Sequence, residues 1–370
     1  MSKRQVEVAE YIKKGLTDKE IASILNISVF TVKTHLKRLY EKLEVSGRTE
    51  LAGLSDDVEA IEAWEMMDTL TAATLNSQTL TLMRQTVFSY VNNYPQTPPD
   101  ELLLPVHRQL RWLRQILTQP QPVAIRRQAV QLIGVLAGVA GNIAMDQHQN
   151  TQAEGYFDVA IVASKEAGDN DLIAWILATR SLVPFFSGRP KDAVKLLDRA
   201  STIAHQSSSP RRQAWIAALQ ARALAAVGNT TTALKQLDIA RAALVAASSP
   251  EGNDFFDEPR LLGLTGGTML LLRRTGEASR LLKNTIELRS IEDVKGRALA
   301  TLDLASCRLI EGDIDEAFRL IEKSLLIAKG CIVAPIISRI QLLQANMMMV
   351  NPISAVQVKH LLREHIKEKE

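Results

Sequence analysis

The sequence predicts an all-α protein in which an N-terminal helix-turn-helix precedes a stack of helical hairpins. Three observations support this fold class. Residues 15–52 read GLTDKEIASILNISVFTVKTHLKRLYEKLEVSGRTELA, with two apolar patterns of helical period on either side of a tight turn. Beyond Val58 no alternating β-branched run occurs, and aromatic residues make up only 5% of the chain. Glycine and tryptophan positions also recur in phase, 40 residues apart, between residues 175 and 228.

The first helix of the N-terminal motif is expected to begin near Asp18 and to run for about two turns. Thr17, with Glu20 three residues later, forms a capping box in which each side chain accepts a hydrogen bond from the other residue's free backbone N–H. The apolar side chains of this helix recur at helical spacing and are expected to face a core; they are Ile21, Ile24 and Leu25.

A second helix is expected after Asn26, which breaks the first helix, and Ile27, which fills the turn. Ser28 is placed to cap this second helix. Its apolar side is formed by Val32, Leu36, Leu39, Tyr40 and Leu43. Small polar and basic side chains remain on its outer side, namely Thr31, Lys33, Thr34, Lys37 and Arg38.

The outer side of the second helix has the chemistry of a DNA-reading surface. Lys33 and Lys37 are four residues apart and so share one face, from which lysine reaches guanine acceptors or phosphates. Hydroxyl and methyl groups of the two threonines suit base edges, and Arg38 with Lys42 suits the sugar-phosphate backbone. An ordinary solvated basic helix would carry the same charges, so the identity of the whole motif has to decide between the two interpretations.

The motif resembles the LuxR-type (GerE-like) helix-turn-helix over about 50 of the 370 residues. The matching positions are Gly15, Leu16, Thr17, Lys19, Glu20, Ile21, Ala22, Leu25, Ile27, Ser28, Thr31, Val32, Lys33, His35, Leu36, Tyr40, Lys42, Leu43, Val45, Arg48, Thr49, Glu50, Leu51 and Ala52. The chain departs from the pattern at Gln5, where a glutamate is usual, and at Glu44, where the family has a helix-ending glycine.

The resemblance implies a role for each matching position. Residues at Lys33, Thr34 and Lys37 would meet the bases, and those at Lys19 and Thr31 would approach phosphates. A fourth helix, Arg48 to Leu54, would support dimerisation. Together with the chemistry of the second helix, this gives eight candidate DNA contacts: Lys19, Ser28, Thr31, Lys33, Thr34, Lys37, Arg38 and Lys42. The implied partners are double-stranded DNA and a second copy of the chain.

Charge and composition are consistent with one local anion-binding surface. Residues 1–52 hold ten Lys and Arg against seven acids, which accounts for the net charge of +3 of the whole chain. Two cysteines without a Cys-x-x-Cys spacing, Cys307 and Cys331, indicate core thiols in a reducing compartment. We find no signal peptide and no run of about 18 apolar residues free of charge, so a cytoplasmic location without membrane contact is expected.

Residues beyond the N-terminal motif repeat as helical hairpins. Ala153, Ala193, Ala233 and Ala317 each begin a similar helix, in the segments NTQAEGYF, RPKDAVKLL, NTTTALKQL and DIDEAFRLI. Gly188, Gly228 and Gly312 mark the preceding turns, and Gly276 opens a looser copy, RTGEASRLL. Gly188 and Gly228 are 40 residues apart, as are Trp175 and Trp215, so two features recur in phase.

These hairpins resemble tetratricopeptide (TPR-like) repeats, although the units exceed the roughly 34 residues of that repeat. Such hairpins stack into an α-solenoid with a concave face. The resemblance to repeat domains of bacterial regulators implies dimerisation and binding of a small-molecule, peptide or protein effector. Residues expected toward the concave face are Trp175, Arg180, Trp215, Gln220, Arg222, Arg297 and Arg308, each of which is more simply a packing or surface residue, so no effector site is named.

We therefore expect three segments: a DNA-binding domain at 1–54, a helical linker or irregular repeats at 55–145, and a TPR-like sensor and dimerisation domain at 146–370. A short connection, Gly53 to Asp57, follows the first of these. Any sensor is expected to be C-terminal to the DNA-reading motif.

The sequence offers no catalytic set. The six histidines are scattered, and no Gly-x-x-x-x-Gly-Lys loop occurs, so we expect neither enzyme activity nor a bound metal or cofactor. Gly263, Gly266 and Gly267 lie within a helical pattern and indicate close helix packing. The main interpretation is a transcription regulator; the alternative is a repeat scaffold whose N-terminal module docks a protein partner.

Overall fold

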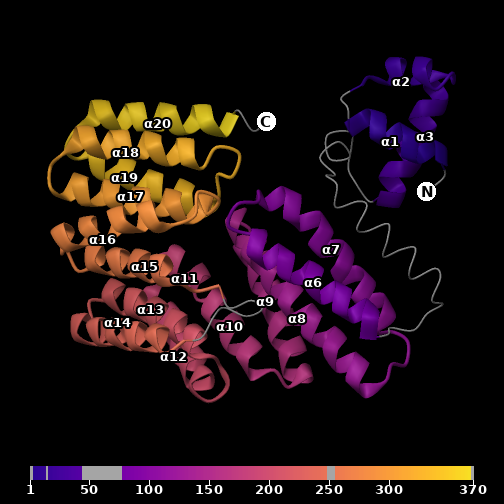
Figure 1. The fold of residues 1–370 in the computed structure, drawn as a ribbon. Helices are drawn as coiled ribbons and strands as arrows, with labels where there is room; N and C mark the ends of the chain where they lie inside the picture. Colours follow the sequence, from indigo (N-terminus) through magenta and orange to yellow (C-terminus); the bar gives the residue numbers. More distant parts are fainter. Residues whose placement is uncertain (1–2, 14–15, 44–76, 248–254, 368–370) are drawn as a thin grey trace. The chain divides into compact units, whose positions relative to one another are not determined.

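The computed structural model describes residues 3–13, 16–43, 77–247 and 255–367, and these residues form helices and turns without a strand (Figure 1). The chain divides into two compact units, Met1–Thr74 and Leu75–Glu370. The expected all-α class is confirmed. The three-segment division at residues 54 and 145 stays a prediction.

The first unit contains three described helices, α1 (Lys3–Lys13), α2 (Asp18–Ile24) and α3 (Val29–Leu43). Helix α2 begins at Asp18 and carries the expected capping box, with the Thr17 N–H donating to Glu20 Oε2 over 2.7 Å. Its core is formed by side chains at most 7% exposed, contributed by all three helices: Val8, Ile12, Ile21, Ala22, Leu25, Val32, Leu36 and Leu39.

One core assignment in this unit was wrong. Ile24 is 52% exposed, whereas Ile21 and Leu25 are buried as expected. Helix α2 is only seven residues long, and its buried stripe follows Ile21, Ala22 and Leu25. Ile24 therefore falls on the edge of the helix that faces away from α1 and α3. The fourth helix expected at Arg48 to Leu54, and Glu44, lie outside the described residues.

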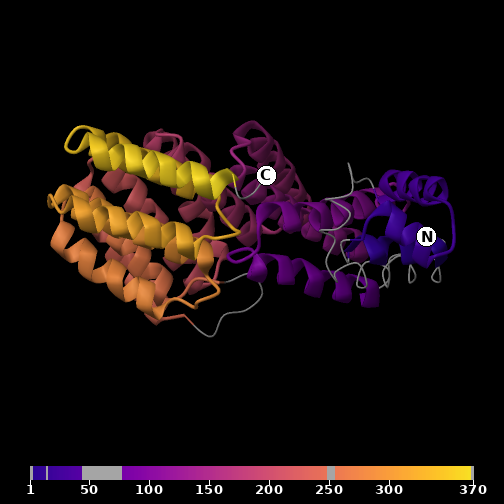
Figure 2. The same ribbon diagram turned by 90° about the horizontal axis from the view of Figure 1, so that it is seen from above.

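The second unit is a series of helical hairpins (Figure 1). Two helices, α6 (Ser77–Asn93) and α7 (Pro99–Ile116), pack against α8. The hairpins that follow pair α8 (Val123–Asp146) with α9 (Asn150–Ala167), α10 (Asn170–Arg180) and α11 (Leu182–Phe186) with α12 (Pro190–Ser207), α13 (Pro210–Ala226) with α14 (Thr230–Val245), α15 (Glu258–Leu271) with α16 (Thr275–Leu288), α17 (Val294–Ile310) with α18 (Ile314–Ile327), and α19 (Ala334–Met348) with α20 (Pro352–Lys367). Seen from above in Figure 2, the orange and yellow hairpins lie in successive layers.

The turn inside five of the six hairpins has one repeated geometry. Its central residue has a left-handed φ of 61° to 84°, at His148, Gly188, Gly228, Arg273 and Gly312. The next backbone N–H donates to a carbonyl five residues earlier, as from Asn229 to Leu224 over 2.9 Å and from Asp313 to Arg308 over 2.9 Å. Five residues after each central position stands a fully buried alanine, at Ala153, Ala193, Ala233, Ala278 and Ala317.

The alignment of alanines is thus confirmed, but one turn assignment was wrong. Gly276 lies inside α16, and the left-handed position of that hairpin belongs to Arg273, with φ 61°. An alanine Cβ would fit between neighbouring helices where a larger side chain would not, which explains why the small residue recurs. The left-handed turn tolerates an arginine at a cost in backbone energy.

The helix pair α10 and α11 is interrupted at Ser181, between Trp175 and the following turn. Pro184 has no backbone N–H, so the carbonyl of Arg180 cannot receive the usual helical hydrogen bond. The short helix α11 carries Phe185 and Phe186 at its end, where the two rings contact edge to face with centroids 5.5 Å apart. After this break both aromatic rings lie beside Arg222 of α13.

Helix α8 supplies the centre of the first hairpin. A Cβ added at Gly138 would lie 2.4 Å from Trp175 Cζ3, so the backbone of α8 approaches the indole too closely for any side chain.

By length and composition α8 could cross a membrane, and 78% of its apolar 18-residue window is buried within the fold. The expectation that no such run exists overlooked residues 128–145, which carry amides but no charge. Its burial matches the core helix of a folded unit.

Two segments far apart in sequence meet in the second unit. The Lys295 backbone N–H donates to the Pro95 carbonyl over 3.2 Å, and Cys331 Sγ lies 3.5 Å from the Thr97 carbonyl. The connection between α6 and α7 therefore touches the start of α17 and the segment before α19. Both cysteines are buried thiols outside any disulfide, as expected for core residues.

Candidate nucleic-acid interface and ligand-binding surfaces

Helix α3 presents the cationic face that the sequence predicts. Lys33, Lys37 and Arg38 are exposed, while Val32, Leu36 and Leu39 between them are at most 5% exposed. The buried stripe anchors the helix on α1 and α2, so the charged side chains are held on the opposite side. Lys19 on α2 is exposed as well. Lys42 belongs to α3, but its side chain lies outside the described residues.

The start of α3 is fixed by two hydroxyl groups. Ser28 Oγ accepts from the Thr31 backbone N–H over 3.0 Å and lies 2.8 Å from Thr31 Oγ1. Ser28 thus caps the helix as expected. Thr34 Oγ1 donates to the Phe30 carbonyl over 2.9 Å, which leaves its methyl group and an oxygen lone pair for other contacts.

Helix α1 holds the end of α2 in place through Arg4. Its Nη2 donates to the Leu25 carbonyl over 2.5 Å, and its Nη1 donates to Glu7 Oε2 over 2.7 Å. The carbonyl belongs to Leu25, the C-cap residue directly after α2, and carbonyl groups at a helix end lack a donor within the helix. Arg4 therefore fixes the turn that precedes α3, a role that spacing alone does not reveal.

Phe30 is a surface residue that the sequence reasoning did not select. It is 80% exposed, one helical turn before Lys33 and Thr34 on the same face of α3. An aromatic ring on a polar, cationic face is unusual for a residue with only a packing role. The available signal was its position outside the apolar period of the helix. Its ring could contact thymine methyl groups.

Most residues expected on the concave face of the repeats already have partners. Trp175 and Trp215 are 2% and 7% exposed, and Trp215 packs edge to face against Phe255. Arg180 forms ion pairs with Glu154 and Asp158, Gln220 donates to Asp198, and Arg308 pairs with Glu311. The structure therefore favours packing and surface roles for these five residues. Arg222 has different surroundings, which include two aromatic rings.

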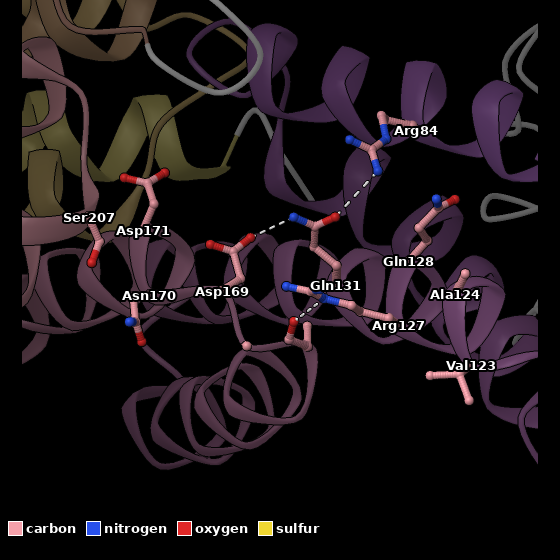
Figure 3. Close-up of a pocket in the computed structure, with 12 residues that line it drawn as sticks. Arg84, Val123, Ala124, Arg127, Gln128, Gln131, Asp169, Asn170, Asp171 and Ser207 are labelled. Carbon is pink, nitrogen blue, oxygen red and sulfur yellow. Dashed lines mark hydrogen bonds between the residues drawn. The ribbon is translucent and has the colours of Figure 1, made fainter.

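A groove of about 940 Å³ runs between α6, the start of α8 and the turn from α9 to α10 (Figure 3). Gln131 connects its two sides, accepting from Arg84 over 3.3 Å and donating to Asp169 Oδ2 over 2.5 Å. Arg127 Nε donates to the Ala167 carbonyl over 2.7 Å. Arg84, Gln131 and Asp169 thus bond to one another, and Arg127 bonds to the backbone, so these charged groups already have partners.

Close packing explains the three glycines of α15. A Cβ at Gly266 would lie 2.8 Å from Leu282 Cγ, and one at Gly263 would lie 3.1 Å from Thr285 Cγ2. These contacts bring α15 and α16 together, as the sequence indicates. Across the residues that the structure describes, no group of three or more His, Cys, Asp or Glu is arranged to hold a metal ion.

Residues 1–55 match the family described as bacterial regulatory proteins, luxR family. The match confirms a LuxR-type helix-turn-helix domain at this end of the chain. It includes the capping box, the turn and the cationic helix α3 described above.

Several curated transcription regulators are similar to this chain over the same segment. The regulator YhjB of Escherichia coli (strain K12) is 48% identical over 52 residues, which are 14% of this chain and 26% of YhjB. The transcriptional regulatory protein LiaR of Bacillus subtilis (strain 168) is 44% identical over 52 residues, 14% of this chain and 25% of LiaR. NarP of Escherichia coli (strain K12), a nitrate/nitrite response regulator, is 44% identical over 48 residues, 13% and 22% of the two chains. This chain spans about a quarter of the length of these relatives.

Two solved structures are weakly similar to this chain. Yeast Tom70 has a TM-score of 0.37 and 16% identity, covering 86% of this chain and 67% of Tom70. Kinesin light chain TPR-like repeats of Podosopora anserina have a TM-score of 0.35 and 16% identity, covering 52% of this chain and 93% of that chain. The likeness concerns the fold alone.

Proposed function

We propose that this chain is a cytoplasmic transcription regulator that binds a specific DNA sequence as a homodimer and responds to an effector on its hairpin unit. The single observation that carries the DNA-binding part is the exposed cationic face of α3 within a LuxR-type helix-turn-helix domain. The effector and the dimer are proposed because the helical hairpins of the larger unit, Leu75–Glu370, resemble the repeat domains of bacterial regulators.

In the proposed complex, α3 lies in the major groove. Lys33, Thr34 and Lys37 read base edges, and Phe30 adds an apolar contact on the same face. Phosphates of one DNA strand are approached by Lys19 on α2 and by Ser28 and Thr31 at the start of α3. Phosphates of the other strand are approached by Arg38 and Lys42, further along α3. The phosphate contacts supply affinity and register, and the base contacts supply sequence specificity.

A protein-docking role for the N-terminal unit is the competing function. Ile24 at 52% and Phe30 at 80% exposure favour it, because exposed apolar side chains also suit a protein partner. The two functions differ in their response to salt. Binding to DNA weakens steeply as salt releases counterions from phosphates, whereas an apolar protein contact changes little.

Selection of genomic fragments by the purified full-length protein, at about 0.15 M salt, tests the proposal. Enrichment of one inverted-repeat motif is expected, because a two-fold dimer reads two half-sites. A single unpaired half-site would contradict the dimer and leave DNA recognition in place. Recovery of a stable protein partner, with fragments enriched no further than by a Lys33→Ala/Lys37→Ala variant, would support docking instead.

A further inference from the structure

Three charged side chains from different hairpins meet within the second unit. Arg222 belongs to α13, Asp303 to α17 and Arg339 to α19, all first helices of their hairpins. Arg339 forms an ion pair with Asp303 Oδ1, and Arg222 Nη2 lies 3.9 Å from Asp303 Oδ2. One carboxylate is therefore shared between two guanidinium groups.

This cluster is shielded from solvent. The side chains of Arg222, Arg339 and Asp303 are 14%, 15% and 8% exposed. Among the described residues, neither arginine has another carboxylate within ion-pair distance, so the three groups together carry one excess positive charge. Arg222 Nε is buried and has no hydrogen-bond partner there. A shielded, incompletely paired guanidinium is costly in free energy.

Aromatic and backbone surfaces complete the surroundings. The Arg222 guanidinium carbon lies 4.9 Å from the Phe185 ring centroid and 5.9 Å from that of Phe186, so the two rings of α11 line one side. On another side α15 approaches through Gly267, where a Cβ would lie 3.3 Å from Asp303 Oδ2 and 3.5 Å from Arg222 Nε. Five helices therefore meet at this cluster: α11 and the first helices of four successive hairpins, α13, α15, α17 and α19.

Burial lowers the pKa of both arginines. Loss of solvent lowers the pKa of Arg222 to about 10, and loss of solvent together with the charge of Arg222 lowers the pKa of Arg339 to about 9. Both groups remain protonated at neutral pH, so the excess charge persists in the folded state. A negatively charged group placed between them would relieve the repulsion and fill the free donor on Arg222.

We propose that Arg222 and Arg339 bind an anion that presents a carboxylate or phosphate group, with its attached body against Phe185 and Phe186. The planar guanidinium forks match both oxyanions in bidentate fashion, and aromatic rings offer an apolar surface beside them. The groove at Gln131 differs because its polar groups already bond to one another. The role of this anion as the effector rests on the proposed function, whereas its binding does not.

Titration calorimetry with inorganic phosphate, and separately with acetate, measures the binding at constant ionic strength. The protein is the full-length Lys33→Ala/Lys37→Ala variant, which removes two of the cations on α3 that would themselves bind phosphate; Arg38 and Lys42 remain in every variant compared and so do not affect the comparison. Saturable binding of at least one anion is expected, and Arg222→Met or Arg339→Met should weaken it at least tenfold. Arg126→Met is the matched control, because Arg126 pairs with Glu166 on the surface at 46% exposure, and it should leave binding unchanged.

A third substitution is expected to increase the affinity for the anion, and it tests the proposal even if the methionine variants do not fold. Asp303→Asn removes the carboxylate that competes for the two guanidinium groups, so anion binding should become tighter. Absence of saturable binding in the parent protein, equal binding in Arg339→Met, or weaker binding in Asp303→Asn would each overturn the proposal. DNA binding by the natural sequence is measured separately; its failure with anion binding intact would overturn the proposed function alone.

Discussion

Lys295 Nζ lies 2.9 Å from Asp146 Oδ2, although 149 residues separate the two side chains along the chain. The pair is almost fully shielded, with exposures of 8% and 4%. Tyr94 donates its hydroxyl to the same carboxylate oxygen over 2.7 Å, and the Lys295 ammonium stands 3.8 Å from the Tyr94 ring centroid. Burial and the negative charge of Asp146 raise the pKa of Tyr94, so its hydroxyl stays protonated and serves as the donor.

Removing one charge of this pair should be strongly destabilising. Lys295→Met leaves the Asp146 carboxylate buried without its cation, at an expected cost of about 3–5 kcal/mol in the free energy of unfolding. The double variant Asp146→Asn/Lys295→Met removes the unpaired charge and should recover part of the loss. Urea unfolding of the full-length chain measures both. Arg126→Met, which breaks an exposed pair, should cost less than about 1 kcal/mol, and an equal cost would contradict the assignment.

The left-handed turn positions give a prediction of increased stability. His148 and Arg273 have φ values of 62° and 61° and exposed side chains, so replacing either with glycine should remove backbone strain and gain up to about 1 kcal/mol. Gly228→Ala, at φ 82°, should lose a similar amount. Gly276→Ala is the control, since Gly276 is helical with open space around it and should become slightly more stable. The midpoint of thermal unfolding of the four variants measures these changes in stability. A higher midpoint in Gly228→Ala would refute the argument that left-handed positions strain a residue with a side chain.

Contact between α8 and α10 predicts opposite effects at two helical glycines. Gly138→Ala would place a methyl group against Trp175 and should cost about 1–3 kcal/mol through overpacking. Gly155→Ala in α9 has no heavy atom within 4 Å of the new Cβ and should gain up to about 1 kcal/mol. Chemical denaturation compares the two, and equal stabilities would show that the indole moves aside without cost.

Lysine and phenylalanine on α3 should affect DNA binding in different ways. Lys33→Ala/Lys37→Ala should abolish specific binding and reduce the slope of log affinity against log salt by about one to two units. Phe30→Ala should weaken binding to the selected sequence while leaving the slope unchanged, because the ring carries no charge. Lys191→Ala/Lys235→Ala removes two exposed lysines of the second unit and should change neither quantity. Unchanged DNA affinity in the first variant would refute these contacts.

Acidification should destabilise the contact between α7 and α9. His107 Nε2 lies 2.6 Å from the Tyr156 hydroxyl, and burial, with a smaller effect of Arg111, lowers the pKa of His107 below 6.5. The unfolded chain then binds more protons, so this stability is full above pH 6.5 and is lost as the pH falls toward the lowered pKa. Thermal midpoints between about pH 7.5 and pH 5 should fall less in His107→Gln. His205→Gln, at an exposed histidine, should follow the parent chain.

Local patterns in the sequence were sufficient for the elements that depend on neighbouring residues. The Thr17 and Glu20 pair predicted the start of α2, and the repeated alanines marked the second helix of four hairpins, because both signals act within a few residues. The turn at Arg273 was assigned to Gly276 since glycine is the usual left-handed residue, yet the turn register is set by the buried Ala278 five residues later.

Features that depend on tertiary contact could not be inferred from spacing. Nothing near Asp146 or Lys295 in the sequence indicates the other, and Arg222, one of several arginines expected on the concave face, is distinguished only by sharing Asp303 with Arg339. Ile24 shows the same limit in reverse, since helical period alone assigned it to the core. Partners across helices, rather than residue types, decide these positions.

The junction at residues 94–97 changes how the hairpin series folds. A stack in which each repeat touches only its neighbours behaves as a one-dimensional system, and its ends can open independently. Contacts from Tyr94, Pro95 and Thr97 to Lys295 and Cys331 add links of high contact order, which close only after the intervening hairpins have formed. The cost of closing that long loop is expected to slow folding. Once the loop is closed, these contacts should couple the opening of α6 to that of α17, so we expect the amide protons of the two regions to exchange as one cooperative unit.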